Sequence, residues 1–144
     1  MKYLYYPGCS LEGTAREYDI ATRAVMHSVD AELIDIADWT CCGASAAEPT
    51  SHLLSLALPA RNIALAEGND DIDDILVPCS ACYLNLKRVI ETVKKDPASL
   101  ATLNSILAEE NLHMGRRMHI RHLGVGFTEE VASRPEVLPF FFVL

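Results

Sequence analysis

The sequence predicts an α/β domain with a mainly parallel sheet and helical crossovers. Its length of 144 residues suits a single domain whose apolar core needs no disulfides. Half of the residues are hydrophobic and 22% are charged, as in ordinary globular proteins. Short apolar runs alternate with longer segments of helical period, without an internal repeat or a low-complexity linker. Such alternation is typical of parallel strands joined by helices that cover both faces of the sheet.

A strand and a helix are predicted at the amino-terminal end. Residues 2–6 are aromatic and apolar and stop at Pro7-Gly8, which indicates a strand closed by a turn. Thr14 and Glu17 have the spacing of a capping box, in which each side chain bonds the other's backbone N–H. The helix after this box should run to about His27.

A second strand and helix follow. Residues 32–37 alternate acidic and apolar side chains, as a half-buried strand does. Thr50 can cap a helix to about Glu67, which Pro59 should kink or restart because proline lacks an N–H. This helix is apolar nearly all round, so we expect it to be buried on several sides or half covered by a partner.

The second half of the chain predicts two more helices and two more strands. Residues 74–77 form the third strand, and a helix follows to about Lys95. Asp96-Pro97 is an N-cap and first-turn pair for a helix that ends near Leu112. Residues 118–122 are a candidate fourth strand.

All five cysteines follow directly on predicted strands: Cys9 after the first, Cys41 and Cys42 after the second, Cys79 and Cys82 after the third. The carboxyl ends of parallel strands share one edge of a sheet, where ligand sites gather. We therefore expect the cysteines to converge in space. Thiolate sulfur is a ligand that iron in iron–sulfur clusters prefers, so the spacing indicates a metal-cluster site.

Three other uses of these cysteines compete with a metal cluster. Buried structural thiols are common for single cysteines but not for five at strand ends. A tetrahedral zinc site needs four ligands and usually pairs two short hooks, whereas here one half would be an adjacent pair plus a distant residue. A thioredoxin-like dithiol would use Cys79 and Cys82 and leave the other three without a role.

The segments that carry the cysteines resemble the cysteine-rich CCG domain of heterodisulfide reductase B subunits and related iron–sulfur oxidoreductases. The similar segments are 6–10, 38–44, 57–62, 77–83 and 121–123. The resemblance implies that Cys9, Cys41, Cys42, Cys79 and Cys82 hold a noncubane 4Fe-4S cluster. It also implies cleavage of a small-molecule disulfide, which in the methanogenic enzyme joins coenzyme M to coenzyme B.

The resemblance further implies partners. Electrons would arrive through a ferredoxin-like C subunit and a flavin-containing A subunit. The B subunits of the family carry two CCG domains, so a second CCG domain is another expected partner. Residues 1–123 would form one such domain, and residues 124–144 an atypical tail that a truncation or frame shift would explain. Two alternatives stay open: an electron-transfer module without its own substrate, and a zinc-stabilised interaction domain.

Four other residues are weaker candidates for a role in the site. Arg61 and Arg88 could pair with a carboxylate or sulfonate of the substrate, because a guanidinium offers two parallel donors. His52 and His122 could relay protons to a product thiol, because histidine titrates near neutral pH. Arginines on helices are more often simply solvated, and an ordinary structural role is the stronger interpretation for the histidines too.

Charge and hydropathy exclude some classes of function. The net charge of −8 argues against a nucleic-acid partner, since a phosphate backbone requires a basic face. We find no signal peptide and no run of about 20 apolar residues that would span a bilayer. We therefore expect a cytoplasmic location, where clustered cysteines more often bind metal than form disulfides.

Overall fold

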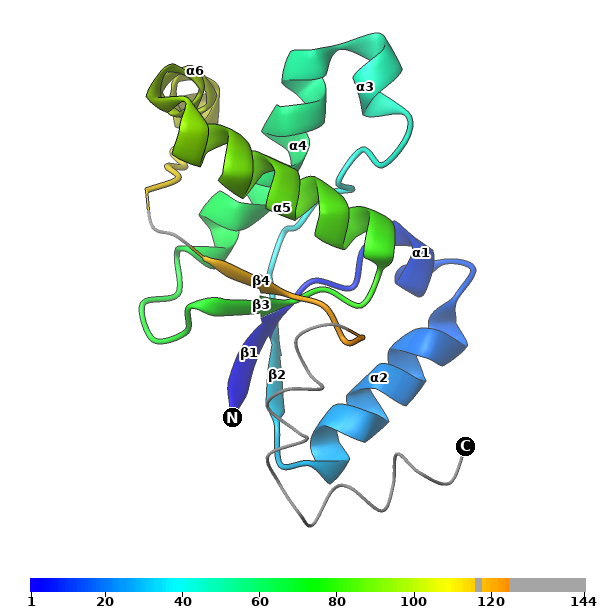
Figure 1. The fold of residues 1–144 in the computed structure, drawn as a ribbon. Coiled ribbons are helices and arrows are strands. Elements are labelled where there is room, and N and C mark those ends of the chain that lie inside the picture. Colours follow the sequence, from blue (N-terminus) through cyan, green and yellow to red (C-terminus); the bar gives the residue numbers. More distant parts are fainter. Residues whose placement is uncertain (116–117, 125–144) are drawn as a thin grey trace.

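A four-stranded parallel sheet forms the centre of the computed structural model, which describes residues 1–115 and 118–124 (Figure 1). The strands lie in the order β2-β1-β3-β4, and every pair is parallel. This confirms the predicted α/β class. The strands are β1 (Lys2–Tyr5), β2 (Glu32–Asp35), β3 (Asp74–Leu76) and β4 (His119–Arg121).

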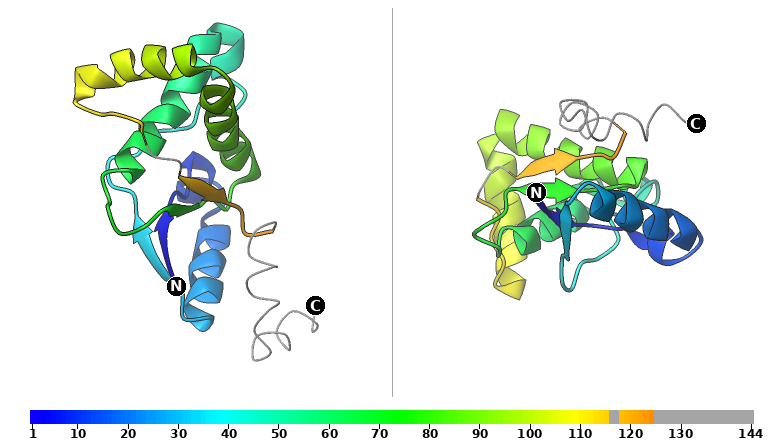
Figure 2. Two further views of the ribbon diagram at one scale, coloured as in Figure 1. Left: turned by 60° about the vertical axis from the view of Figure 1, so that its left-hand side comes forward. Right: turned by 90° about the horizontal axis from the view of Figure 1, so that it is seen from below.

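Helices cover both faces of this sheet. Figures 1 and 2 show α4, α5 and α6 grouped together, apart from α2. The helices are α1 (Cys9–Glu12), α2 (Arg16–Ser28), α3 (Ala47–Thr50), α4 (His52–Ala66), α5 (Ser80–Lys95), α6 (Pro97–Leu107) and the short 3-10 helix η1 (Ala108–Glu110). In the part of the chain that the structure describes, no helix is both long and apolar enough to cross a membrane.

Side chains of β1 alternate between two apolar clusters, as the period of a strand requires. Tyr3 and Tyr5 pack with Met26 of α2 on one face. Leu4 and the following Tyr6 belong to the larger cluster on the opposite face, to which α4, α5 and α6 contribute. Because β1 is buried on both faces, it fixes the middle of the domain.

The strand order places a change of direction beside β1. The chain leaves β1 for β2 on one side and then crosses to β3 on the other, so that Leu4 is in register with both Ile34 and Ile75. In open α/β sheets, ligands bind at the carboxyl ends of the strands where the order reverses in this way. The segments after β1, β2 and β3 all start at that edge.

The predicted capping box before α2 is wrong. The N-cap of α2 is Ala15, and no side chain caps the helix. A short helix that sequence patterns did not predict, α1, precedes it, and the N–H of Ala15 bonds to the carbonyl of Ser10 (2.8 Å). The backbone of α1 therefore sets the start of α2, and Thr14 lies before the cap position.

The start of α4 also differs by one residue from the prediction. Ser51 is the N-cap, and its hydroxyl accepts a bond from the N–H of Leu54 (3.3 Å). Thr50 instead ends α3, where its hydroxyl donates to the carbonyl of Ala46 (3.1 Å). Pro59 does not restart the helix: α4 continues through it, and Pro59 itself is buried.

The predictions for the second half are confirmed more closely. Asp96 caps α6 and accepts a bond from the N–H of Ala98 (3.1 Å), with Pro97 in the first turn. The α-helix ends at Leu107, and η1 extends the turn to Glu110. The predicted strand at 118–122 is β4. The predicted tail 124–144 lies outside the described residues except for Gly124.

Candidate metal centre

The five cysteines meet at the carboxyl edge of the sheet, where they form a thiol cluster. Cys9 begins α1, Cys41 and Cys42 lie in the loop after β2, and Cys79 and Cys82 stand at the start of α5. The Sγ atoms of Cys9 and Cys41 are 3.5 Å apart, and those of Cys42 and Cys82 are 3.3 Å apart. The predicted convergence is therefore confirmed, although the cysteines span most of the described chain.

The thiol cluster has a buried half and an exposed half. Cys42 and Cys82 are 1% and 3% exposed and belong to the larger apolar cluster. Cys79 is half-buried, and Cys9 and Cys41 are exposed. A group held between the five sulfurs would lie against the protein core on one side and be accessible on the other.

Two glycines allow the chain to approach the thiol cluster so closely. Gly8 has φ 75° and ψ 161°, a region almost restricted to glycine, and a Cβ there would lie 2.8 Å from the Sγ of Cys82. Gly43 has φ 79°, and a Cβ there would lie 2.7 Å from the Cβ of Ala47. Pro7-Gly8-Cys9 and Cys41-Cys42-Gly43 therefore need their glycines to bring the sulfurs together.

The environment favours a thiolate at Cys42. The hydrogen bond between the sulfurs of Cys42 and Cys82 lowers the pKa of Cys42 to about 6, and the backbone N–H of Ala44 contributes. The same bond, together with burial, raises the pKa of Cys82. Although Cys41 is exposed, partial desolvation of its sulfur and the neighbouring thiol of Cys9 raise its pKa as well. Several thiolates at one place need a compensating cation, and metal binding supplies one by displacing the thiol protons.

Helix α5 contributes to this environment. Its N-cap is Cys79, and Cys82 lies in its first turn. The N-terminus of a helix carries a partial positive charge, which is favourable beside metal-bound sulfur.

Tyr6 lies buried close to the thiol cluster. Its ring is fully buried and meets the ring of Trp39 edge-on, with centroids 5.2 Å apart. Burial raises the pKa of Tyr6, and four of the cysteines raise it further. Tyr6 therefore keeps its proton, which it donates to the carbonyl of Thr40 (2.7 Å).

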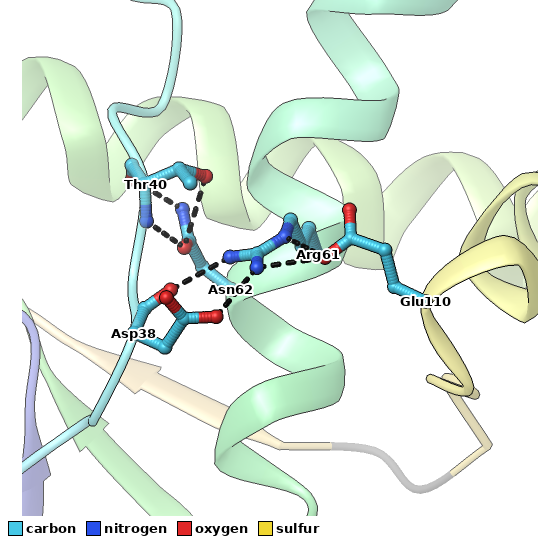
Figure 3. A network of polar contacts seen from close by, with 5 residues as sticks. All are labelled: Asp38, Thr40, Arg61, Asn62 and Glu110. Carbon is cyan, nitrogen blue, oxygen red and sulfur yellow. Dashed lines mark hydrogen bonds and ion pairs between the residues drawn. The ribbon is translucent and has the colours of Figure 1, made fainter.

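The loop that carries Cys41 and Cys42 is fixed by residues of α4, as Figure 3 shows. The carboxamide of Asn62 accepts a bond from the N–H of Thr40 (2.8 Å) and donates one to its carbonyl (2.8 Å). Arg61 donates to the carbonyl and to the carboxylate of Asp38, both at 2.7 Å, and is also paired with Glu110. Two neighbouring residues of α4 therefore hold two residues of the loop.

Sequence reasoning missed Asn62, and it missed Asn85, whose Nδ2 lies 3.4 Å from the carbonyl of Cys42. Both are buried polar residues, 0% and 8% exposed. A polar amide in an otherwise apolar part of a helix must find hydrogen-bond partners when it is buried, so Asn62 among alanines and Ile63 was a usable signal. The identity of its partner, Thr40, depends on tertiary packing.

Two weaker candidates, Arg61 and Arg88, form ion pairs in the structure. The side chain of Arg61 is 14% exposed and engaged with Asp38 and Glu110. Arg88 of α5 pairs with Glu48 of α3. Both arginines connect structural elements, and a contact between either guanidinium and a substrate stays a prediction.

The two histidines differ in position. His52 is exposed at the first position of α4. His122 follows β4 at the same edge as the thiol cluster, and its ring lies 5.3 Å from that of Tyr83, the residue after Cys82. Its Nδ1 accepts a bond from the N–H of Gly124 (3.1 Å). A proton-relay role for either histidine stays a prediction.

The donor set of the site is sulfur alone, from five cysteines. Across residues 1–115 and 118–124, no three His, Cys, Asp or Glu side chains are arranged to hold a single metal ion. The sulfurs lie instead as two close pairs with Cys79 beside them. Soft thiolates without oxygen or imidazole ligands fit an iron–sulfur cluster, in which several irons share the ligands.

The fold and the site define a parallel α/β domain with a cysteine-rich centre at its switch point. Residues 3–87 match the family model of the CCG cysteine-rich domain, and the chain belongs to this family.

Three similar curated proteins include components of two reductases. The chain is 34% identical over 111 residues to the membrane anchor subunit of the 8-methylmenaquinol:fumarate reductase of Wolinella succinogenes, covering 77% of this chain and 38% of that protein. It is 28% identical to the B subunit of the ferredoxin:CoB-CoM heterodisulfide reductase of Methanosarcina mazei, covering 85% and 40%. A protein of Archaeoglobus profundus described as like the heterodisulfide reductase B subunit is 24% identical, covering 85% and 41%. The chain thus spans about two fifths of these relatives.

A solved structure has the same fold. A crystal structure of a hypothetical protein from Helicobacter pylori superposes with a TM-score of 0.78 at 18% sequence identity. The match covers 91% of this chain and 26% of that one. At this identity the similarity concerns the fold alone.

Proposed function

We propose that this chain is an iron–sulfur component of a heterodisulfide-reductase-like complex that reduces a small-molecule disulfide to two thiols. Cys9, Cys41, Cys42, Cys79 and Cys82 would hold a noncubane 4Fe-4S cluster. The observation that carries the proposal is the convergence of five thiols at the switch point of the sheet. Similarity to heterodisulfide reductase B subunits supports the choice of a disulfide.

The buried cysteines, the exposed cysteines and His122 would have different roles in such a site. When bound, the cluster supplies electrons and an iron that can accept a substrate sulfur. Buried Cys42 and Cys82 would hold it on the side away from water, and exposed Cys9 and Cys41 on the side that a substrate can reach. Cleavage of a disulfide to two thiols consumes two electrons and two protons, and His122 lies at the edge where such protons would be delivered.

The proposed partners follow from the relatives. The Methanosarcina mazei relative is named as part of a ferredoxin-dependent heterodisulfide reductase. Electrons would reach this chain through a ferredoxin-like C subunit and a flavin-containing A subunit. The relatives are more than twice as long as this chain, which supports a second CCG domain as a partner. A cytoplasmic location remains a prediction.

A second candidate is an electron-transfer module without its own substrate. The Wolinella succinogenes relative, at 34% identity, is named as a subunit of an 8-methylmenaquinol:fumarate reductase, and this name includes no disulfide. In such a module the same cluster would pass electrons between partner proteins. Reduction of a disulfide by the assembled complex, with this chain required, would separate the first candidate from the second.

Metal and sulfide content after anaerobic reconstitution tests the proposed site. We expect about four irons per chain with matching sulfide, as in a cysteinyl cluster. Cys42→Ser should change the spectrum or lose iron, because Cys42 is among the buried ligands. Ser80→Ala, which lies between Cys79 and Cys82, is the control and should do neither. Stoichiometric zinc without sulfide would contradict the proposal and favour the interaction domain; an unchanged Cys42→Ser variant would contradict the five-ligand assignment.

A further inference from the structure

The backbone N–H and the backbone carbonyl of Thr40 both bond to the side chain of one residue, Asn62. Asn62, which is fully buried, accepts from the N–H of Thr40 and donates to its carbonyl, each at 2.8 Å. The carbonyl also accepts from the hydroxyl of Tyr6 at 2.7 Å. A carboxamide offers an acceptor and a donor side by side, so Asn62 replaces the backbone of a neighbouring strand (Figure 3). Cys41 is the next residue along the chain.

A second carboxamide lies on the other side of the adjacent cysteines. The Nδ2 of Asn85 on α5 is 3.4 Å from the carbonyl of Cys42, 3.6 Å from its Sγ and 3.4 Å from the carbonyl of Ala44. Asn85 is 8% exposed. An N–H directed at a ligand sulfur stabilises negative charge on that sulfur, which is one of the ways in which proteins set cluster potentials.

The turn between these two asparagines needs external support. Gly43 and Ala44 both have positive φ, 79° and 27°, and Ala44 is not a glycine. Such conformations persist only where surrounding contacts fix them. Beyond the asparagines, Arg61 holds Asp38, which also has a positive φ of 57°.

We propose that Asn62 and Asn85 are positioning residues for the adjacent cysteine pair. Asn62 fixes the backbone that enters Cys41-Cys42, and Asn85 fixes the turn that leaves it and donates to the sulfur of Cys42. This inference rests on the proposed cluster for its spectroscopic consequences and on the loop geometry alone for its effect on thiol access.

The test compares Asn62→Asp and Asn85→Asp with the wild-type chain. Asp has the same shape but lacks the N–H donors, and its charge would face the carbonyl of Thr40 or the sulfur of Cys42. For Asn62→Asp we expect iron loss to a chelator to accelerate, because the backbone that enters Cys41 loses its support; about 10- to 100-fold, the range for lost outer-shell contacts, is the upper bound. For Asn85→Asp we expect a lower midpoint potential, since the more negative, reduced cluster loses a donor.

Asn104 provides the matched control. Its carboxamide binds the backbone of Met114 in the same two-sided way, at 2.8 and 2.9 Å, but it lies on α6, away from the thiol cluster. Asn104→Asp should lower the urea midpoint without changing the cluster spectrum, the potential or iron loss. The inference is overturned if Asn104→Asp changes the spectrum, potential or iron loss as much as Asn62→Asp and Asn85→Asp do. It is also overturned if Asn62→Asp and Asn85→Asp match the wild type.

A readout without metal separates this inference from the proposed function. In the metal-free chain, Asn62→Asp should make buried Cys42 react faster with an alkylating reagent, followed by mass spectrometry, whereas Asn104→Asp should not. Tyr6→Phe removes one donor to Thr40 and should have a smaller effect of the same sign. A wild-type chain that binds zinc would end the cluster proposal, yet faster alkylation in Asn62→Asp alone would still support the positioning role; unchanged alkylation would refute it.

Discussion

Tyr5 connects β1 to α2 through a single buried hydroxyl. Its ring is 0% exposed, and its hydroxyl donates to the carboxylate of Asp19 at 2.6 Å. The guanidinium of Arg23 lies 4.4 Å from the centre of the ring and pairs with both Asp19 and Asp35. Burial, followed by the bond to Asp19, raises the pKa of Tyr5 far above its usual value.

The raised pKa predicts a loss of stability at alkaline pH. The folded chain holds this proton more tightly than the unfolded chain, so the stabilisation is complete below the unfolded pKa of about 10 and declines as pH rises above it. Tyr5→Phe should lower stability by about 1 kcal/mol at neutral pH and should reduce the alkaline decline. Urea unfolding at neutral and alkaline pH measures both, with exposed Tyr18→Phe as the control. An equal decline in wild type and Tyr5→Phe would contradict the assignment.

Single residues also show which features the sequence predicts and which depend on tertiary packing. The convergence of the cysteines is predictable because their positions relative to the strands are visible in the sequence, and they do converge. The chemistry of Arg61 suggests a substrate contact, but its partners Asp38 and Glu110 are 23 and 49 residues away and are set by packing. The positions of the cysteines can be predicted from the sequence, but their role as cluster ligands is a proposal that metal and sulfide analysis tests.

At the scale of helices and strands, local signals succeeded where one residue decides the structure. Asp96-Pro97 predicted the start of α6 because the cap and the proline act on their own turn. The signals failed where short helices compete for the same residues. Thr14 and Thr50 are good caps by type, but α1 and α3, each of four residues, occupy the segments around them. Helices this short are held by tertiary contacts and leave little periodic pattern.

The structure predicts that Ser51, rather than Thr50, stabilises the start of α4. Ser51→Ala removes the bond to the N–H of Leu54 and should cost about 1 kcal/mol. Thr50→Ala removes only a bond from its hydroxyl to the carbonyl of Ala46 on exposed surface and should cost less. Urea midpoints of the two variants give the comparison. A larger loss in Thr50→Ala would move the cap back to the residue that the sequence favoured.

At the scale of the whole molecule, the thiol cluster lies at one edge and opens outward. The side with Cys42 and Cys82 is sealed by α4 and α5, and the side with Cys9 and Cys41 is exposed. The prediction that α4 is buried on several sides or half covered by a partner is met in part: eight of its residues are buried, while Leu53 and Leu54 are 44% and 39% exposed. These two adjacent leucines at the start of α4 are the part of the helix that a partner could cover.

The chain alone is therefore expected to bind the cluster without turning over a disulfide. Cleavage takes two electrons, whereas a cluster passes one at a time. A second CCG domain would supply the other electron and would enclose the substrate from the opposite side. With a low-potential electron donor, disulfide reduction should appear only when that domain or a ferredoxin-like C subunit is added. If Leu53 and Leu54 form part of the contact, Leu54→Ser should weaken this stimulation without loss of iron. Ile20→Ser, on α2 at a side chain 66% exposed, is the control and should leave it unchanged. Steady disulfide reduction by the isolated chain would show that one domain forms a complete active site.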